Sequence, residues 1–182
     1  MVTVGIDQSY TSCGFVALDG DKILYAEAYG SDKSSDIFWR SWTQTLYTNE
    51  LINKWQPKHI ALEGLAFMRF GNATRDLAGL QFVLVTTLRY RRNQDVEVIA
   101  PLTLKKFATG SGKAKKDDMV DSLPQDVREY FEAQGFKKSK GLYDVTDAYW
   151  LAKYIQNKNN STDAKALKQS SKKRKTKKSN KD

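Results

Sequence analysis

Residues 2–7 read VTVGID, and this short stretch decides the fold. Apolar and small residues alternate along it as in a β-strand, and the run ends at Asp7, where polar residues indicate a turn. Two further runs of β-type residues follow, 13–18 and 22–29, and the Asp19-Gly20 pair between them is typical of a hairpin. The start of the chain is therefore predicted to be a three-stranded antiparallel meander with a carboxylate at the end of its first strand.

Helices and short strands alternate after this meander. In order, the predicted elements are a helix from residues 34–36 to 56, a buried strand over 58–62 that ends at Glu63, a helix over 72–92, a strand over 96–100, a basic segment over 104–116, a helix over 124–134 and a helix over 143–157. This order predicts an α/β fold with a five-stranded mixed sheet, three antiparallel strands followed by parallel ones, flanked by helices. Such an order is the ribonuclease H-like arrangement.

Composition and charge divide the chain into two parts. Of its 182 residues 40% are hydrophobic, which is enough for one core and excludes a chain that is disordered throughout. The net charge of +9 is uneven, because residues 163–182 carry nine Lys or Arg against two Asp. We therefore predict a folded domain over residues 1–157 and a disordered, Lys-rich basic tail over 158–182. A cationic tail favours a polyanionic partner, above all nucleic acid, although a solubilising or targeting extension has the same composition.

The sequence also predicts the compartment. Cys13 is the single cysteine, so an intramolecular disulfide is excluded. The N-terminus lacks the basic start and apolar stretch of a signal peptide, and no apolar run reaches the roughly 20 residues needed to cross a bilayer. These observations predict a soluble, cytoplasmic protein with no membrane partner.

Four acidic residues occupy positions from which they could converge. Asp7 and Glu63 each close an apolar strand, and both strands are predicted to lie in the sheet. Asp144 and Asp147 project from one face of the last predicted helix, because residues at i and i+3 are neighbours on a helix surface. The structural alternative is a helix cap or a solvated face. Apolar residues around each acid favour a site instead, because an unpaired charge there would be costly.

Clustered carboxylates repel one another unless cations neutralise them. Mg²⁺ is the cation that carboxylate and phosphate oxygens select together. Two such ions about 4 Å apart can activate a water and stabilise the departing oxygen in phosphodiester cleavage. The acidic residues therefore point to metal-dependent chemistry on a phosphodiester.

The chain resembles the RuvC family of Holliday junction resolvases in four segments that stand in the family's order. These segments are residues 4–9 with 13–15, residues 60–63, residues 101–106 with 109–116, and residues 143–148. The resemblance covers residues 1–156. It implies that the catalytic residues are acids that hold two Mg²⁺ ions, for which Mn²⁺ is expected to substitute: Asp7, Glu63, Asp144 and Asp147.

Basic residues of the third segment complete the implied site. The resemblance makes Lys105 a phosphate contact and Lys116 the catalytic lysine beside the scissile phosphate. A point cation near the cleaved phosphate can stabilise the charge that builds in the transition state, so the two lysines also make sense unaided. Lys106, Lys113 and Lys115 are predicted to touch only the DNA backbone.

Residues 64–70, GLAFMRF, depart from the family pattern. Better-known bacterial members carry an amide and then an aromatic residue three places after the Glu, implicated in junction opening and sequence preference. Here Phe67 or Phe70 is a candidate wedge that stacks on an unpaired base, with Arg69 as a further DNA contact, and core packing is the alternative for the aromatic residues. The departure and the basic tail resemble the phage-encoded branch of the family, so the expected location is a bacterial or host cytoplasm.

The resemblance implies a Mg²⁺-dependent, structure-selective crossover junction endodeoxyribonuclease. Such an enzyme resolves four-way and related branched DNA by paired, symmetric phosphodiester cleavage. Paired cuts need two active sites, so we predict a homodimer, with the second apolar face of the helix over 72–92 as the interface and with Leu80 and Leu84 as the positions to test. Two alternatives stay open: a ribonuclease H-like nuclease for RNA:DNA hybrid, flap or other branched DNA, and a protein that binds branched DNA without cutting it.

Overall fold

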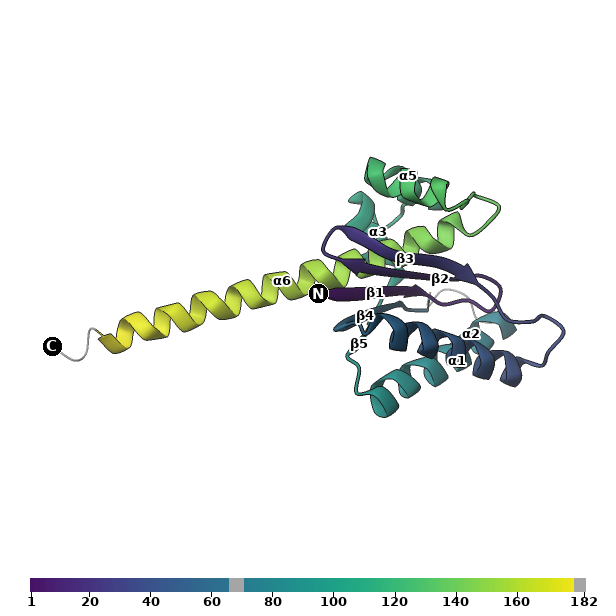
Figure 1. Cartoon of the computed structure of the whole chain (residues 1–182), viewed down its shortest axis with the longest axis horizontal. Coiled ribbons are helices and arrows are strands. Elements are labelled where there is room, and N and C mark those ends of the chain that lie inside the picture. Colours follow the sequence, from purple (N-terminus) through teal and green to yellow (C-terminus); the bar gives the residue numbers. More distant parts are fainter. Residues whose placement is uncertain (66–70, 179–182) are drawn as a thin grey trace.

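The computed structural model describes residues 1–65 and 71–178. Its described strands form one sheet in the order β3-β2-β1-β4-β5 (Figure 1). They are β1 (Val2–Asp7), β2 (Cys13–Asp19), β3 (Lys22–Tyr29), β4 (His59–Glu63) and β5 (Val96–Ile99). β1 pairs antiparallel with β2 and parallel with β4, while β2 and β3 are antiparallel and β4 and β5 are parallel. The predicted mixed sheet of the ribonuclease H-like fold is confirmed.

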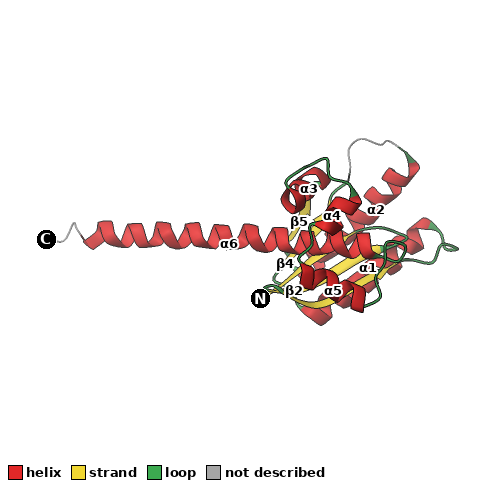
Figure 2. Ribbon diagram, turned by 90° about the horizontal axis from the view of Figure 1, so that it is seen from above, coloured by secondary structure: helices red, strands yellow, loops and turns green. Residues whose placement is uncertain are grey.

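Helices cover both faces of this sheet (Figures 1 and 2). They are α1 (Ile37–Trp55), α2 (Asn72–Thr86) with its π-helical continuation η1 (Thr87–Arg91), α3 (Pro101–Thr109), α4 (Lys116–Asp121), α5 (Gln125–Ala133) and α6 (Leu142–Lys178). Apolar residues of α1, α2 and η1 pack with Val4 and Ile6 of β1 on one face. α4, α5 and α6 pack with Val16 and Leu18 of β2 on the other. Among the described residues, no helix is long and apolar enough to span a membrane.

Two glycines let α6 lie directly on the sheet. A Cβ atom added to Gly5 of β1 would stand 1.9 Å from the Ala148 carbonyl oxygen of α6. A Cβ atom added to Gly14 of β2 would stand 2.0 Å from the Asp144 carbonyl oxygen. Such distances leave no room for a side chain, so the first turns of α6 touch the backbone of two strands. The acids of this helix are thereby brought down to the level of the sheet.

The two positions of α2 that we chose for testing a dimer contact face the core instead. Leu80 is 1% exposed and Leu84 is 2% exposed, and Leu84 packs with Leu88 against the sheet. The choice of Leu80 and Leu84 as interface positions is therefore wrong. A helix on a sheet must bury its most continuous apolar stripe inward, and here that stripe is the leucine row. The opposite stripe is the outward one, since Phe82 is 74% exposed.

The basic segment over 104–116 also differs from expectation, because helices α3 and α4 occupy much of it. Pro101 stands at the start of α3, where its missing N–H costs nothing, and Gly110 ends the helix in the left-handed region with φ of 81°. At the start of α4 the Asp118 side chain accepts from the backbone N–H of Lys115. The residues that start and end these helices can be recognised in the sequence, but the glycines and lysines among them favoured a loop.

The last helix is longer than predicted. We expected it to end near Asn157 and a disordered tail to follow, but α6 continues as helix to Lys178 and projects as a rod away from the sheet (Figures 1 and 2). Residues 142–178 contain neither Pro nor Gly and include nine Lys and four Ala, which favour helix. The change of composition after Asn157 thus marks where the helix leaves the folded body, not where the helix stops.

Candidate active site

Asp7 and Glu63 stand side by side at one end of the sheet. Each is the last residue of its strand, and the parallel register pairs Ile6 with Leu62, one position earlier. Ile6 and Leu62 point into the core under α1 and α2, so the next residues along each strand point to the opposite face, where α6 lies. The carboxyl groups of Asp7 and Glu63 are hydrogen-bonded to each other.

Asp144 and Asp147 lie at the same end of the sheet, on the face that α6 covers. Both lie in the first two turns of α6, and the close approach of Gly14 to the backbone of Asp144 fixes the height of this end of the helix. Asp144 and Asp147 both act electrostatically on Asp7, and Asp147 also acts on Glu63. The structure therefore brings the four predicted acids together.

The acidic side chains of the cluster lie close together and are largely shielded from water. Burial and the neighbouring charge of Glu63 raise the pKa of Asp7 well above its ordinary value. Burial and Glu63 also raise the pKa of Asp147 to about 7. Burial raises the pKa of Glu63 as well, although the hydrogen bond from Asp7 and the charges of Lys105 and Lys116 oppose this. The cluster is short of positive charge.

Two lysines act electrostatically on this cluster. Lys105 of α3 is partly buried, and Lys116 at the start of α4 is exposed. Their charges act on both Glu63 and Asp147. Lys116 Nζ also lies 5.3 Å from the centroid of the Tyr143 ring, an aromatic contact that helps to orient the ammonium group.

The other predicted DNA contacts lie farther out. Lys106, Lys113 and Lys115 are exposed, and the first two line a groove of about 590 Å³ that also contains Phe107 and Tyr154. The lysine charges that act most strongly on Glu63 and Asp147 are those of Lys105 and Lys116. Phe67, Arg69 and Phe70 lie outside the described residues.

Three polar residues of the site were not among the predicted ones. The Ser12 hydroxyl donates to Asp144 Oδ2 at 2.5 Å. Gln8 Nε2 and Gln81 Nε2 both donate to the backbone carbonyl of Glu63, at 3.3 Å and 3.1 Å. The only available signal was for Gln81, a polar residue that interrupts the apolar run of its helix. Nothing local marked Ser12, because its partner is 132 positions away.

The chemistry of the donor set fits a divalent cation such as Mg²⁺. Four carboxylates converge, Lys105 and Lys116 are the described cations that act on them, and hard cations take carboxylate oxygens. Within residues 1–65 and 71–178, however, no three His, Cys, Asp or Glu side chains are grouped tightly enough to hold one ion together. Asp144 turns one oxygen to Ser12, and the carboxyl groups of Asp7 and Glu63 are hydrogen-bonded to each other. The residue types therefore fit the ion, although their side chains are engaged with each other and with Ser12.

Comparison with known proteins connects this arrangement to one group of enzymes. No protein-family model matches the sequence. The chain is 26% identical over 127 residues to the crossover junction endodeoxyribonuclease RuvC of Brachyspira hyodysenteriae, covering 66% of this chain and 77% of the relative. It is 27% identical over 123 residues to the enzyme of the same name from Prochlorococcus marinus, covering 65% and 77%.

Solved structures share the fold at lower identity. Thermus thermophilus RuvC in complex with a Holliday junction substrate has a TM-score of 0.65 at 20% identity, with 84% of this chain and 90% of that chain covered. The Fowlpox virus resolvase in complex with Holliday junction DNA has a TM-score of 0.58 at 17% identity, with 86% and 98% covered. The yeast mitochondrial Holliday junction resolvase has a TM-score of 0.61 at 16% identity, with 82% and 75% covered.

Proposed function

We propose that this distant homologue of the RuvC crossover junction endodeoxyribonucleases is a Mg²⁺-dependent nuclease that resolves four-way and related branched DNA by paired, symmetric cleavage. The observation that carries the proposal is the convergence of carboxylates from β1, β4 and α6 at one end of the sheet, beside two lysines. The nuclease domain comprises residues 1–157, and the basic segment after it adds affinity for DNA.

The acids and lysines have distinct roles in this proposal. Asp7, Glu63, Asp144 and Asp147 would hold two Mg²⁺ ions, which supply the activation of a water and the stabilisation of the departing oxygen when bound. Lys105 contacts a phosphate, and Lys116, whose charge acts on Glu63 and Asp147, stands beside the scissile phosphate. The acids thus position the reacting phosphate, and the lysines balance the charge that grows on it.

DNA outside the cut is held by the exposed basic residues. Lys106 and Lys113 line the groove beside α3, and Lys115 is exposed next to Lys116. Such cations contact phosphates without reading sequence. The proposed contacts to unpaired bases come from the sequence alone and are Phe67, Arg69 and Phe70.

The test is cleavage of labelled four-way junctions, flaps, linear duplex and RNA:DNA hybrid, each with Mg²⁺ and with Ca²⁺. We expect Mg²⁺ to support paired cuts in the junction, with symmetric positions in opposite strands. Asp144→Asn is expected to remove these cuts and to leave junction binding in Ca²⁺ intact. Preferential cutting of hybrid or flap would keep the nuclease and change its substrate. Tight junction binding without any cut would instead support a binding-only protein.

Paired cleavage requires two active sites, so we propose a homodimer through the outward face of α2 and η1. Phe82 is 74% exposed and Tyr90 is 84% exposed, too much apolar surface for residues that meet only water. Phe82 stands between two grooves, one of about 700 Å³ toward α1 and one of about 390 Å³ toward β5. A projecting ring flanked by hollows can pair with its own copy across a two-fold axis.

Phe82→Glu is expected to convert the dimer to a folded monomer, because the new charge would be buried against the partner's copy. Multi-angle light scattering should then give the mass of one chain, while the melting temperature changes little. Ala133→Glu is the matched control, since Ala133 is exposed at the end of α5, far from this face in the fold. A Phe82→Glu protein that stays dimeric would place the interface elsewhere.

A further inference from the structure

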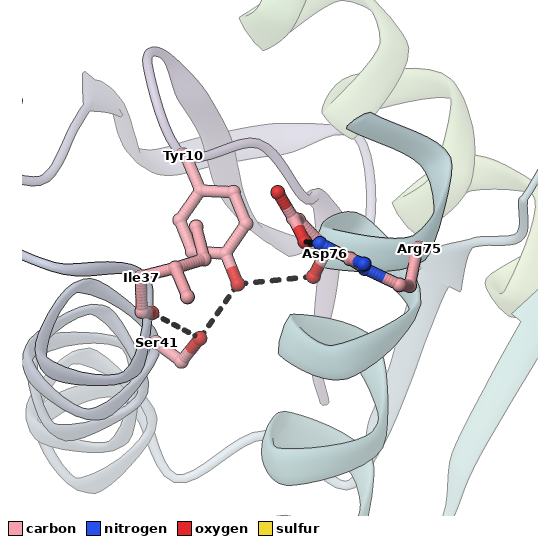
Figure 3. A network of polar contacts seen from close by, with 5 residues as sticks. All are labelled: Tyr10, Ile37, Ser41, Arg75 and Asp76. Atoms are coloured by element: carbon pink, nitrogen blue, oxygen red, sulfur yellow. Dashed lines mark hydrogen bonds and ion pairs between the residues drawn. The ribbon is translucent and has the colours of Figure 1, made fainter. Parts of the chain in front are cut away.

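The turn between β1 and β2, residues 8–12, connects the acidic cluster with the two helices on the opposite face of the sheet. Ser12, at the end of this turn, donates its hydroxyl to Asp144 Oδ2 at 2.5 Å. Two residues earlier, Tyr10 points the other way, into the space between α1 and α2 (Figure 3). A turn without strand or helix geometry of its own depends on such side-chain contacts for its position.

The Tyr10 hydroxyl joins α1 to α2. It donates to the Asp76 carbonyl oxygen at 3.0 Å, and it lies 2.6 Å from Ser41 Oγ, which also reaches the Ile37 carbonyl oxygen (Figure 3). Tyr10 and Ser41 have one hydroxyl hydrogen each for these three contacts. Ser41 donates to the Ile37 carbonyl oxygen and Tyr10 donates to the Asp76 carbonyl oxygen, so the short contact between the two hydroxyl oxygens shares one of these hydrogens.

The backbone of Tyr10 is held as firmly as its side chain. Its carbonyl oxygen accepts from Ser31 N and Ser31 Oγ, both at 2.9 Å, and from the Arg40 guanidinium at 3.3 Å. The same guanidinium lies 5.1 Å from the centroid of the Tyr10 ring. Ser9, the preceding residue, accepts from the Ser12 backbone N–H at 3.4 Å, and its carbonyl oxygen accepts from Gln44 Nε2 of α1. Tyr10 therefore anchors the turn, and Ser12 moves with the anchored backbone.

From this geometry we infer that Tyr10 is a positioning residue for the acidic cluster and acts on Asp144 through Ser12. The inference rests on the proposed function for its catalytic meaning, but it concerns the orientation of one carboxylate. With one oxygen of Asp144 held by Ser12, the other oxygen has a defined direction toward the cluster. Hydrogen bonds of this kind orient metal-binding carboxylates, and their loss typically weakens metal binding about 10-fold to 100-fold.

The position of α2 enters the same chain of contacts. Asp76 belongs to α2, the helix whose outward face carries Phe82. A shift of this helix would therefore move Tyr10 and, through the turn, Ser12. Hydrogen bonds through Tyr10 and Ser12 thus connect the proposed dimer face with the acidic cluster.

A double-mutant cycle with Mn²⁺ as the probe tests the inference. Mn²⁺ binding to the full chain is measured by titration calorimetry for wild type, Tyr10→Phe, Ser12→Ala and the double variant. Ser12→Ala is expected to weaken binding about 10-fold to 100-fold. Tyr10→Phe removes one hydroxyl and should weaken binding roughly threefold to tenfold, the worth of one hydrogen bond. Added to Ser12→Ala, Tyr10→Phe should have no further effect, because its route to Asp144 is already cut.

Two controls separate positioning from general stability. Ser12→Thr keeps the hydroxyl and should retain Mn²⁺ affinity, and Thr11→Ala alters an exposed hydroxyl of the same turn and should leave it unchanged. Melting temperatures are recorded for every variant. Additive losses in the cycle, or a Tyr10→Phe protein that melts earlier but binds Mn²⁺ normally, would overturn the inference, as would a wild type that binds no Mn²⁺. A wild type that binds Mn²⁺ and cuts nothing would refute only the proposed function.

Discussion

Asp7→Asn is expected to abolish Mg²⁺-dependent cleavage and to make the metal-free protein more stable. The loss of activity should be at least about a thousandfold. Metal ions supply several kcal/mol of transition-state stabilisation, and each 1.4 kcal/mol is roughly a factor of ten in rate. Asp7 stands at the centre of the cluster, where Glu63, Asp147 and Asp144 all act on it, so no other side chain can replace it.

The gain in stability follows from the same crowding. Burial and Glu63 raise the pKa of Asp7 above its value in the unfolded chain, so the folded protein holds a proton that the unfolded chain has already released. Between those two pKa values the folded state binds more protons, and stability falls as the pH rises. Asp147, with a pKa of about 7, adds to this fall from about pH 4 to neutrality. An uncharged Asn at position 7 removes the largest part of this loss of stability at high pH.

The measurement is a set of melting temperatures between pH 5 and 8, with and without Mg²⁺, beside junction cleavage assays. Without metal, wild type should melt lower at pH 8 than at pH 5.5, and Mg²⁺ should raise the pH 8 value. Asp7→Asn should flatten this pH dependence and lose most of the response to Mg²⁺. Glu132→Gln changes an exposed acid of α5 and should behave as wild type. An active Asp7→Asn protein would show that the acids are structural.

Gly5→Ala is expected to lower the free energy of unfolding by roughly 3 kcal/mol, the upper range for overpacking a core. The added methyl group would stand 1.9 Å from the Ala148 carbonyl oxygen and 2.6 Å from the Ala152 backbone nitrogen. Both atoms belong to the backbone of α6, so relief requires the whole helix to rise from the sheet. Asp144 and Asp147 would rise with it, away from Asp7, and cleavage should fall even below the melting temperature.

Thermal and urea unfolding of Gly5→Ala check this expectation, with Gly79→Ala as the control. Nothing lies within 4 Å of a Cβ atom at Gly79, so alanine there should stabilise α2 by up to about 1 kcal/mol. A loss of 3 kcal/mol corresponds to roughly 6–12 °C in melting temperature for a chain of this size. Wild-type stability in Gly5→Ala would mean that α6 does not rest on β1 as closely as the structure has it.

The strand order and the four acids were predictable from the sequence because both depend on short local patterns. VTVGID predicts a strand with an acid at its end, and the i, i+3 spacing of Asp144 and Asp147 predicts one helix face. Once the fold is known, these two patterns together place the acids at the same end of the sheet. The roles of the individual acids and lysines remain proposals.

The features that sequence reasoning missed depend on distant partners or on competing signals. Ser12 contacts a helix far along the chain, and Tyr10 contacts two helices at once, so no local pattern indicates either role. The outward face of α2, our proposed dimer face, could not be told from its core face, because both stripes are apolar and only packing shows that Leu84 is inside. In α3 and α4 the helix-start and helix-end signals were present, but the Gly-rich stretch around Gly110 outweighed them.

The close seating of α6 on Gly5 and Gly14 also sets the order in which the cluster is completed. A ribosome delivers β1 and β4 long before the final helix, and N-terminal regions begin to fold first. Until α6 settles onto the two glycines, a nascent chain presents Asp7 and Glu63 without Asp144 and Asp147. Chains that terminate before α6 should therefore lack two of the four acids, so that under the proposed function only chains that contain α6 can cut nucleic acid.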